Sequence, residues 1–113
     1  MEKIEKILKA FADKNRLRIL TLLEHKRMCV CELAFVLGIT QPSVSRHLKK
    51  LKSTGIIGEE QDSFWTNYFI AKTDSLYIRT LLNNLTDWLN EDEIIKSDLE
   101  KAKKADRNKL CCK

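Results

Sequence analysis

The 113-residue sequence predicts a mainly α-helical domain that carries one small β-hairpin. Apolar residues recur at helical spacing over most of the chain, and only three glycines and one proline interrupt them. The segment from Ile56 to Ala71 differs, because β-branched and aromatic residues flank a polar middle, as in a two-stranded hairpin. Hydrophobic residues make up 43% of the chain and charged ones 33%, a composition that excludes a disordered chain.

Two short helices with a tight join are predicted at the start of the chain. The first spans Ile4 to Phe11, where apolar residues fall at helical spacing. Asp13 is then placed to cap a second helix, whose inner side carries Leu17, Leu20 and Leu23.

A third and a fourth helix follow, separated by a short turn. The third is predicted from Cys29 to Leu37 and ends at Gly38, a residue suited to the left-handed conformation just past a helix end. Thr40 caps the fourth helix, Pro42 occupies its first turn, where a missing N–H costs little, and Gly55 ends it.

The outer face of the fourth helix is basic. Val44, Leu48 and Leu51 fall at i, i+4 and i+7 and form the buried side, and the segment 41–55 holds four basic residues and no acidic one. A helix, a glycine-led turn, a basic helix and a hairpin together predict a winged helix-turn-helix that binds DNA. The predicted DNA-binding residues are Gln41, Ser43, Ser45, Arg46, His47, Lys49 and Lys50. His47 lies near the buried boundary, where a packing or phosphate-binding role is equally open. On the wing, the predicted phosphate or minor-groove contacts are Gln61, Thr66 and Asn67.

A fifth helix is predicted from near Thr73 or Asp74 to Leu89, with an apolar stripe wider than a small core needs. The sequence therefore predicts a dimer, with packing of this helix onto the second and third helices as the alternative. The predicted subunit seam consists of Ile4 and Phe11 with Leu81, Leu85 and Trp88. Residues 1–90 form the predicted DNA-binding and dimerisation domain, and residues 91–113 a charged, weakly helical tail that ends in Cys-Cys.

The four cysteines lie in two tight pairs, Cys29 with Cys31 and Cys111 with Cys112. No apolar run reaches the roughly 20 residues that span a bilayer, and the first residues lack the apolar core of a signal peptide, so we expect a cytoplasmic protein without membrane contact. Thiols are kept reduced there, which favours metal binding or redox sensing over structural disulfides. No acid, base and nucleophile cluster around these cysteines, so no enzyme activity is predicted.

Two segments resemble one known family. GITQPSVSRHLKKLKSTGII is similar to the recognition region of the arsenic repressor (ArsR/SmtB) family, and MCVCEL resembles the cysteine box in the third helix of that family. The resemblance covers most of residues 1–90. It implies a homodimeric winged-helix repressor that binds operator DNA when metal-free and releases it when a toxic metal or metalloid binds.

The spacing of Cys29 and Cys31 raises a geometric question. Side chains two positions apart on an ideal helix point about 200° away from each other. A ligand shared by Cys29 and Cys31 would therefore have to distort the first turn of the third helix. We expect thiolates to form readily there, because the helix N-terminus favours negative charge. Thiolates select soft ions, although free cysteines also occur as small core residues.

The resemblance also bears on the identity of the inducer. Arsenic-sensing relatives often carry a third cysteine where this chain has Ala34, and here Cys111 or Cys112 could supply the third sulfur from the same or the partner subunit. Three sulfurs suit trivalent arsenic or antimony, and four would suit Cd, Pb or Zn. The first 28 residues contain no cysteine and 74–89 no histidine, which disfavours the family's cadmium and zinc sites.

The predicted function is therefore a repressor released by trivalent arsenic or antimony. The alternatives are a cadmium, lead or zinc sensor of the same family, a repressor controlled by thiol oxidation, and, from a different class, a thiol-rich metalloid carrier. A carrier has no need of the basic fourth helix. The tail cysteines could also be an incidental thiol pair.

Overall fold

The computed structural model of the protein describes residues 1–110, so Cys111 and Cys112 lie outside the described residues. Within this range the chain is mainly helical, with a single antiparallel hairpin, as predicted. No helix in the described range is long and apolar enough to cross a membrane. The elements are α1 (Glu2–Phe11), α2 (Lys14–His25), α3 (Val30–Leu37), α4 (Gln41–Ser53), β1 (Ile57–Asp62), β2 (Trp65–Ile70), α5 (Leu76–Leu89), α6 (Glu93–Lys104) and α7 (Arg107–Leu110).

Three predicted helix ends are confirmed by their local hydrogen bonds. The Asp13 carboxylate accepts from the backbone N–H of Arg16 at 3.0 Å and begins α2, and the Thr40 hydroxyl accepts from the N–H of Ser43 at 3.3 Å and begins α4. Gly38 ends α3 in the left-handed conformation, with φ of 71°. The start of the fifth helix was misplaced, because Ser75 is the residue whose side chain caps α5.

The hairpin pairs Ile57 with Ile70 and Asp62 with Trp65, so its turn is formed by Ser63 and Phe64. Gln61 and Asp62, in the polar middle of this segment, belong to β1. The wing is also joined to the chain before α3, since Met28 and Tyr68 exchange two backbone hydrogen bonds of 3.2 and 2.9 Å. This isolated bridge had no signal in the sequence.

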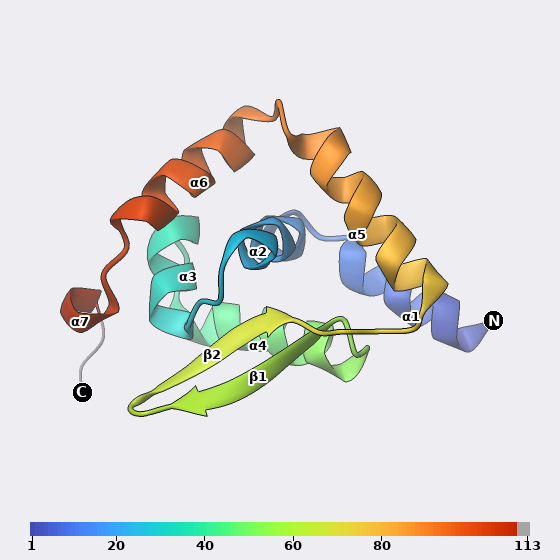
Figure 1. Ribbon diagram of the computed structural model, residues 1–113, viewed down its shortest axis with the longest axis horizontal. Helices are drawn as coiled ribbons and strands as arrows, with labels where there is room; N and C mark the ends of the chain where they lie inside the picture. Colours follow the sequence, from blue (N-terminus) through green and yellow to red (C-terminus); the bar gives the residue numbers. More distant parts are fainter. Residues whose placement is uncertain (111–113) are drawn as a thin grey trace.

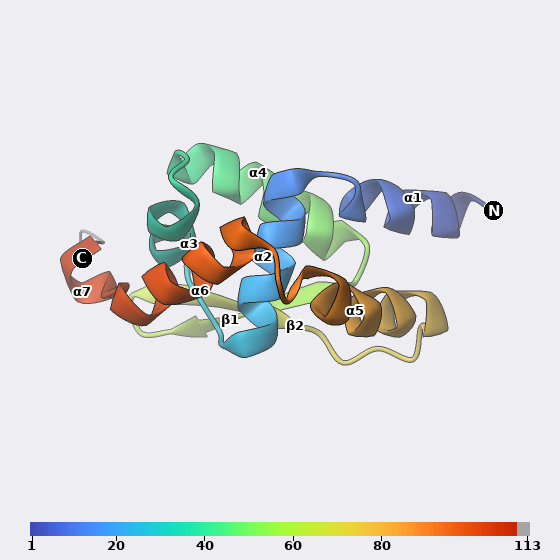
Figure 2. The ribbon, with the colours of Figure 1, turned by 90° about the horizontal axis from the view of Figure 1, so that it is seen from above.

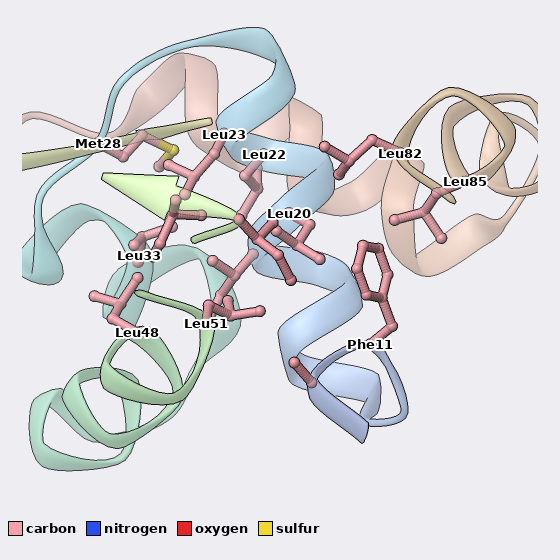
Figure 3. Packing of buried hydrophobic residues seen from close by; sticks show 14 of the residues in the cluster. Phe11, Leu20, Leu22, Leu23, Met28, Leu33, Leu48, Leu51, Leu82 and Leu85 are labelled. Atoms are coloured by element: carbon pink, nitrogen blue, oxygen red, sulfur yellow. The ribbon is translucent and has the colours of Figure 1, made fainter. Parts of the chain in front are cut away.

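The core is organised around α2. In Figure 1, α5 and α6 arch over α2, while α4 and the hairpin lie on its opposite side. Figure 2 shows the same elements from above, with α3 at one side of α2 and α4 running behind α2. In Figure 3, Leu33 of α3 and Leu48 and Leu51 of α4 gather against one face of α2.

The structure corrects the predicted subunit seam. Phe11 and Leu85 are only 8% and 6% exposed, and Figure 3 shows both at the α5 side of the core of a single protomer. Trp88, by contrast, is 68% exposed, and Leu8 on α1 is 48% exposed. The apolar stripe of α5 is wider than the core requires because some of its side chains, such as Leu85, pack into the core and others, such as Trp88, face outward.

The segment predicted as a weakly helical tail contains a well-formed helix. Asp92 caps α6 by accepting from the N–H groups of Ile94 and Ile95, and α6 packs against α2. Asp98 is 1% exposed and receives two 2.8 Å hydrogen bonds from Arg18 of α2, from Nε and Nη2. This bidentate ion pair joins residues 80 positions apart and fixes α6 on the domain.

Candidate functional site

The basic face predicted for α4 is exposed to solvent. Val44, Leu48 and Leu51 are buried against the rest of the domain, and the opposite side of the helix is open. Of the predicted DNA-binding residues, those that are exposed are Gln41, Ser45, Arg46, Lys49 and Lys50. Ser43 is half-buried, and its hydroxyl receives a hydrogen bond from Arg46 Nη2 at 3.0 Å, which orients this arginine along the outer face.

His47 lies at the contact between α4 and α2. Its Nδ1 is 3.2 Å from Nη1 of Arg16 and 4.0 Å from the Asp13 carboxylate, and the imidazole is mostly buried. Burial lowers the pKa of His47 below its ordinary value; Arg16 and Arg46 add to this shift, and Asp13 opposes it. This placement favours the packing role for His47.

Arg16 is a residue that the sequence did not single out. Its side chain donates to the carbonyls of Ala10 at 2.7 Å and Lys9 at 3.1 Å, while it also contacts His47. Arg16 therefore ties the end of α1 to α4. The sequence offered little indication of these contacts of Arg16, because a charged residue three positions after a helix cap is ordinarily exposed to solvent.

The wing presents fewer polar groups to DNA than predicted. Thr66 donates to the Gln61 side chain at 2.9 Å on the exposed surface, so these two remain candidate contacts. Asn67 is 7% exposed and accepts a hydrogen bond from Arg107 of α7, so the prediction that it contacts phosphate is wrong. The cause is α7, which covers this part of the wing.

Cys29 lies just before α3 rather than inside it. It is the N-cap residue, with extended backbone (φ −93°, ψ 171°), and its side chain accepts from the backbone N–H of Glu32. The Glu32 carboxylate in turn accepts from the N–H of Cys29 at 3.0 Å and completes a capping box. Cys29 and Cys31 are therefore not both on an ideal helix as expected, because only Cys31 has helical geometry.

The expectation that thiolates form readily at this helix start is wrong for Cys29. The residue is 3% exposed, and burial raises the pKa of the Cys29 thiol above its ordinary value. The Glu32 backbone N–H favours the thiolate, but the nearby Glu32 carboxylate opposes it. The helix position of Cys29 and the spacing to Glu32 were visible in the sequence, whereas the burial of Cys29 came from the fold.

The described part of the chain does not by itself form a metal site. Residues 1–110 contain no group of three or more His, Cys, Asp or Glu side chains that could hold a metal ion. Cys29 is buried beside the half-buried Cys31, and α7 contacts α3, the helix that carries Cys31. Leu110, at the end of α7, directly precedes Cys111 in the chain. Two cysteines thus lie at α3, next to the segment that leads to two more, and cysteine sulfur is the donor that soft ions prefer.

Comparison with known proteins agrees with the DNA-binding architecture. The family model described as "Bacterial regulatory protein, arsR family" matches residues 13–58. The HTH-type transcriptional regulator MJ1325 of Methanocaldococcus jannaschii is 46% identical over 75 residues, which cover 63% of this chain and 84% of the relative. The arsenic resistance transcriptional regulator ArsR1 of Pseudomonas putida is 30% identical over 93 residues, 78% of this chain and 73% of the relative.

A cadmium regulator is also among the relatives. The cadmium resistance regulatory protein CadC of Listeria innocua is 32% identical over 74 residues, 65% of this chain and 62% of the relative. Among solved structures, the homodimeric winged helix-turn-helix domain Mb0332 of Mycobacterium bovis, a possible ArsR-family regulator, superposes with a TM-score of 0.68 at 26% identity. That match covers 81% of this chain and 82% of the other.

Proposed function

The chain belongs to the arsR family of bacterial regulatory proteins, and from that premise we propose a homodimeric repressor released from operator DNA by trivalent arsenic or antimony. Its relatives are transcriptional regulators, and the chain is a regulator rather than an enzyme. One observation carries the proposal: the Cys29–Cys31 pair begins α3, and α3 packs against α4, whose basic face is exposed. Sensing and DNA-reading segments thus share one interface.

In this proposal, α4 enters the major groove of the operator. Arg46, Lys49 and Lys50 project from the face opposite the buried Val44, Leu48 and Leu51, so base edges and phosphates would meet only polar side chains. A dimer would present two such helices to two half-sites. The operator itself is obtained as a duplex selected with the parent protein from a random-sequence library.

A first prediction concerns Lys50, proposed as a phosphate contact. Each phosphate contact contributes about −0.9 to the slope of log affinity against log salt, so Lys50→Ala in both subunits should flatten the slope by about 2. Fluorescence anisotropy at four salt concentrations measures it. Lys101→Ala, which removes an equal charge from the exposed side of α6, is the control and should leave the slope unchanged. A parental slope in Lys50→Ala would mean that this face of α4 does not meet the DNA backbone.

A second prediction concerns the dimer. Trp88 is 68% exposed in the protomer, so Trp88→Glu should leave the fold intact and weaken dimerisation at least roughly tenfold, because it would bury an unpaired charge in the seam. Sedimentation velocity with circular dichroism distinguishes dissociation from unfolding. Leu85→Glu does not serve here, since Leu85 belongs to the core of one protomer.

Asn83→Glu, an exposed position elsewhere on α5, is the matched control and should remain dimeric. A folded Trp88→Glu protein with parental dimer affinity would place the seam away from this end of α5.

The residues that would hold the inducer are Cys29, Cys31 and one of Cys111 and Cys112. Three thiolate sulfurs provide the soft, pyramidal donor set that trivalent arsenic or antimony accepts. The support from the described residues is the pair of cysteines at α3 and the contact of α7 with that helix. Cadmium remains the alternative ion, because CadC is among the similar proteins, and four sulfurs would suit it better.

The chain's own contacts suggest how the cysteines would influence DNA binding. A Cys29 sulfur that binds the inducer would stop accepting a hydrogen bond from the Glu32 N–H. Because sulfur is a weak N-cap acceptor, losing this cap should destabilise α3 by no more than about 1 kcal/mol. Met28, the preceding residue, is hydrogen-bonded to Tyr68 in the wing. A disturbed start of α3 would therefore reach both α4 and the wing in each subunit.

The experiment that tests the proposal is a titration of the reduced protein bound to its operator. Arsenite, antimonite, cadmium, zinc and peroxide are added separately while anisotropy follows release. We expect release by arsenite at the lowest concentration, with sulfur-only coordination at arsenic by X-ray absorption. Release by cadmium alone would identify a cadmium sensor, release by peroxide alone a redox sensor, and either result would contradict the proposed inducer.

A further inference from the structure

One side chain of α7 is inserted among three residues of the wing. Arg107 Nη1 donates to Asn67 Oδ1 at 2.6 Å, and Nη2 lies 3.4 Å from Asp62 Oδ2. The guanidinium carbon also lies 4.5 Å from the centre of the Trp65 ring. We call this group, Arg107 with Asp62, Trp65 and Asn67, the wing clamp. It joins β1 and β2 to the last helix of the described chain.

The charge of β1 explains why such a clamp matters for DNA binding. The strand carries three carboxylates, Glu59, Glu60 and Asp62, on an element that lies beside DNA in a winged helix-turn-helix. Unpaired, they would repel phosphates. Each has a cationic partner from another element.

The three partners come from different parts of the fold. Glu59 pairs with Lys52 of α4, Glu60 with Arg27 of the segment before α3, and Asp62 with Arg107. The first two partners belong to the helix-turn-helix region itself. Arg107 belongs to α7, whose last residue directly precedes Cys111, and α7 also contacts α3. The neutralisation of Asp62 thus depends on the position of α7.

We propose that Arg107 is a positioning residue that couples the tail cysteines to the wing. With α7 docked, Arg107 neutralises Asp62 and covers Asn67, and the wing is compatible with the DNA backbone. Inducer binding at the tail displaces Arg107 and leaves the Asp62 carboxylate unpaired beside phosphate. The inference rests on the proposed function and adds a route to the wing besides the route through α3.

The clamp is expected to act on DNA affinity more than on folding. The Arg107 side chain is 27% exposed and that of Asp62 58%, and ion pairs with this exposure add little to stability. Arg107→Gln should therefore give a folded dimer. Its melting temperature provides the check.

The first measurement is operator affinity without inducer. Arg107→Gln should lose about fivefold in affinity at low salt, the size expected from one unfavourable charge per subunit near phosphate. Lys109→Gln, an equal charge change at an exposed position of the same helix, is the control and should lose less than about twofold. Adding Asp62→Asn to Arg107→Gln should restore affinity to that of Asp62→Asn alone.

Two results would overturn the inference at this stage. Equal losses in Arg107→Gln and Lys109→Gln would show only a general charge effect. A failure of Asp62→Asn to restore affinity would show that Arg107 supports structure without masking this carboxylate.

The second measurement follows the clamp during induction. The chain has two tryptophans, so Trp88→Phe leaves Trp65 as the reporter, and arsenite should change its emission. The response should persist with Lys109→Gln and be absent with Arg107→Gln. If arsenite releases DNA from the parent protein while Trp65 emission stays constant, the coupling is refuted and the proposed function stands. If arsenite does not release DNA, the proposed function fails, and the Asp62→Asn restoration alone decides the charge-masking role.

Discussion

Replacing both Cys29 and Cys31 with serine should leave operator binding intact and abolish release by arsenite. The hard hydroxyl oxygen of serine is a poor ligand for a soft ion, so the inducer loses two of its three proposed donors. Folding should be preserved, because Cys29 is an N-cap whose side chain already accepts from the Glu32 N–H, and serine is a preferred N-cap residue. The double variant therefore removes the ligands while keeping the cap.

The expected effect is large on the scale of allosteric coupling. A hundredfold loss of operator affinity on induction corresponds to about 2.7 kcal/mol, within the usual range of 1–3 kcal/mol for coupling between two sites. The double variant should show no loss of operator affinity when arsenite is added, which means permanent repression. Operator anisotropy during an arsenite titration measures the difference directly.

The matched control is Cys111→Ser with Cys112→Ser, which should respond at higher arsenite concentrations because only the completing ligand is lost. If the Cys29→Ser, Cys31→Ser protein releases DNA at the parental arsenite concentration, the cysteines at α3 are core residues and the sensing lies elsewhere. Melting curves of both variants would show that any lost response is not a loss of fold.

Replacing Asp98 with alanine should destabilise the protein by about 3 kcal/mol or more, since removing one partner of a buried ion pair leaves the other charge uncompensated. Asp98 is 1% exposed, and it holds the Arg18 guanidinium through two hydrogen bonds of 2.8 Å. A guanidinium remains protonated even without a carboxylate partner, so Arg18 cannot escape this cost in the variant by losing its proton.

Urea unfolding at one fixed protein concentration measures this effect, because a dimer's stability depends on concentration. Glu100→Ala is the control on the same helix: its carboxylate pairs with Lys103 at the exposed surface, so we expect a change below about 0.5 kcal/mol. A loss below about 1 kcal/mol in Asp98→Ala would mean that α6 is not docked on α2 in solution.

These two predictions differ in how much of their basis was visible in the sequence. The cysteine pair, the basic face of α4 and the caps Asp13, Gly38 and Thr40 follow from patterns within a few residues. Such patterns are reliable because a cap hydrogen bond or a helical stripe joins positions three or four apart, and no distant segment is needed to form it.

The tertiary structure decided what those local elements do. Arg18 and Asp98 are 80 residues apart, and Arg107 reaches Asn67 across 40, so no local pattern pairs them. The same holds for burial: Cys29 has the helix position that favours a thiolate, yet the packing around it raises its pKa. Likewise, Leu85 and Trp88 belong to one apolar stripe, and only their neighbours place Leu85 in the core and leave Trp88 exposed. The sequence by itself determined the helices, the wing and the DNA-reading face, because these depend on short-range hydrogen bonds and periodicity. The tertiary structure decided which charges are paired and which cysteine is buried, because these contacts join segments that are far apart in the chain and meet only on folding.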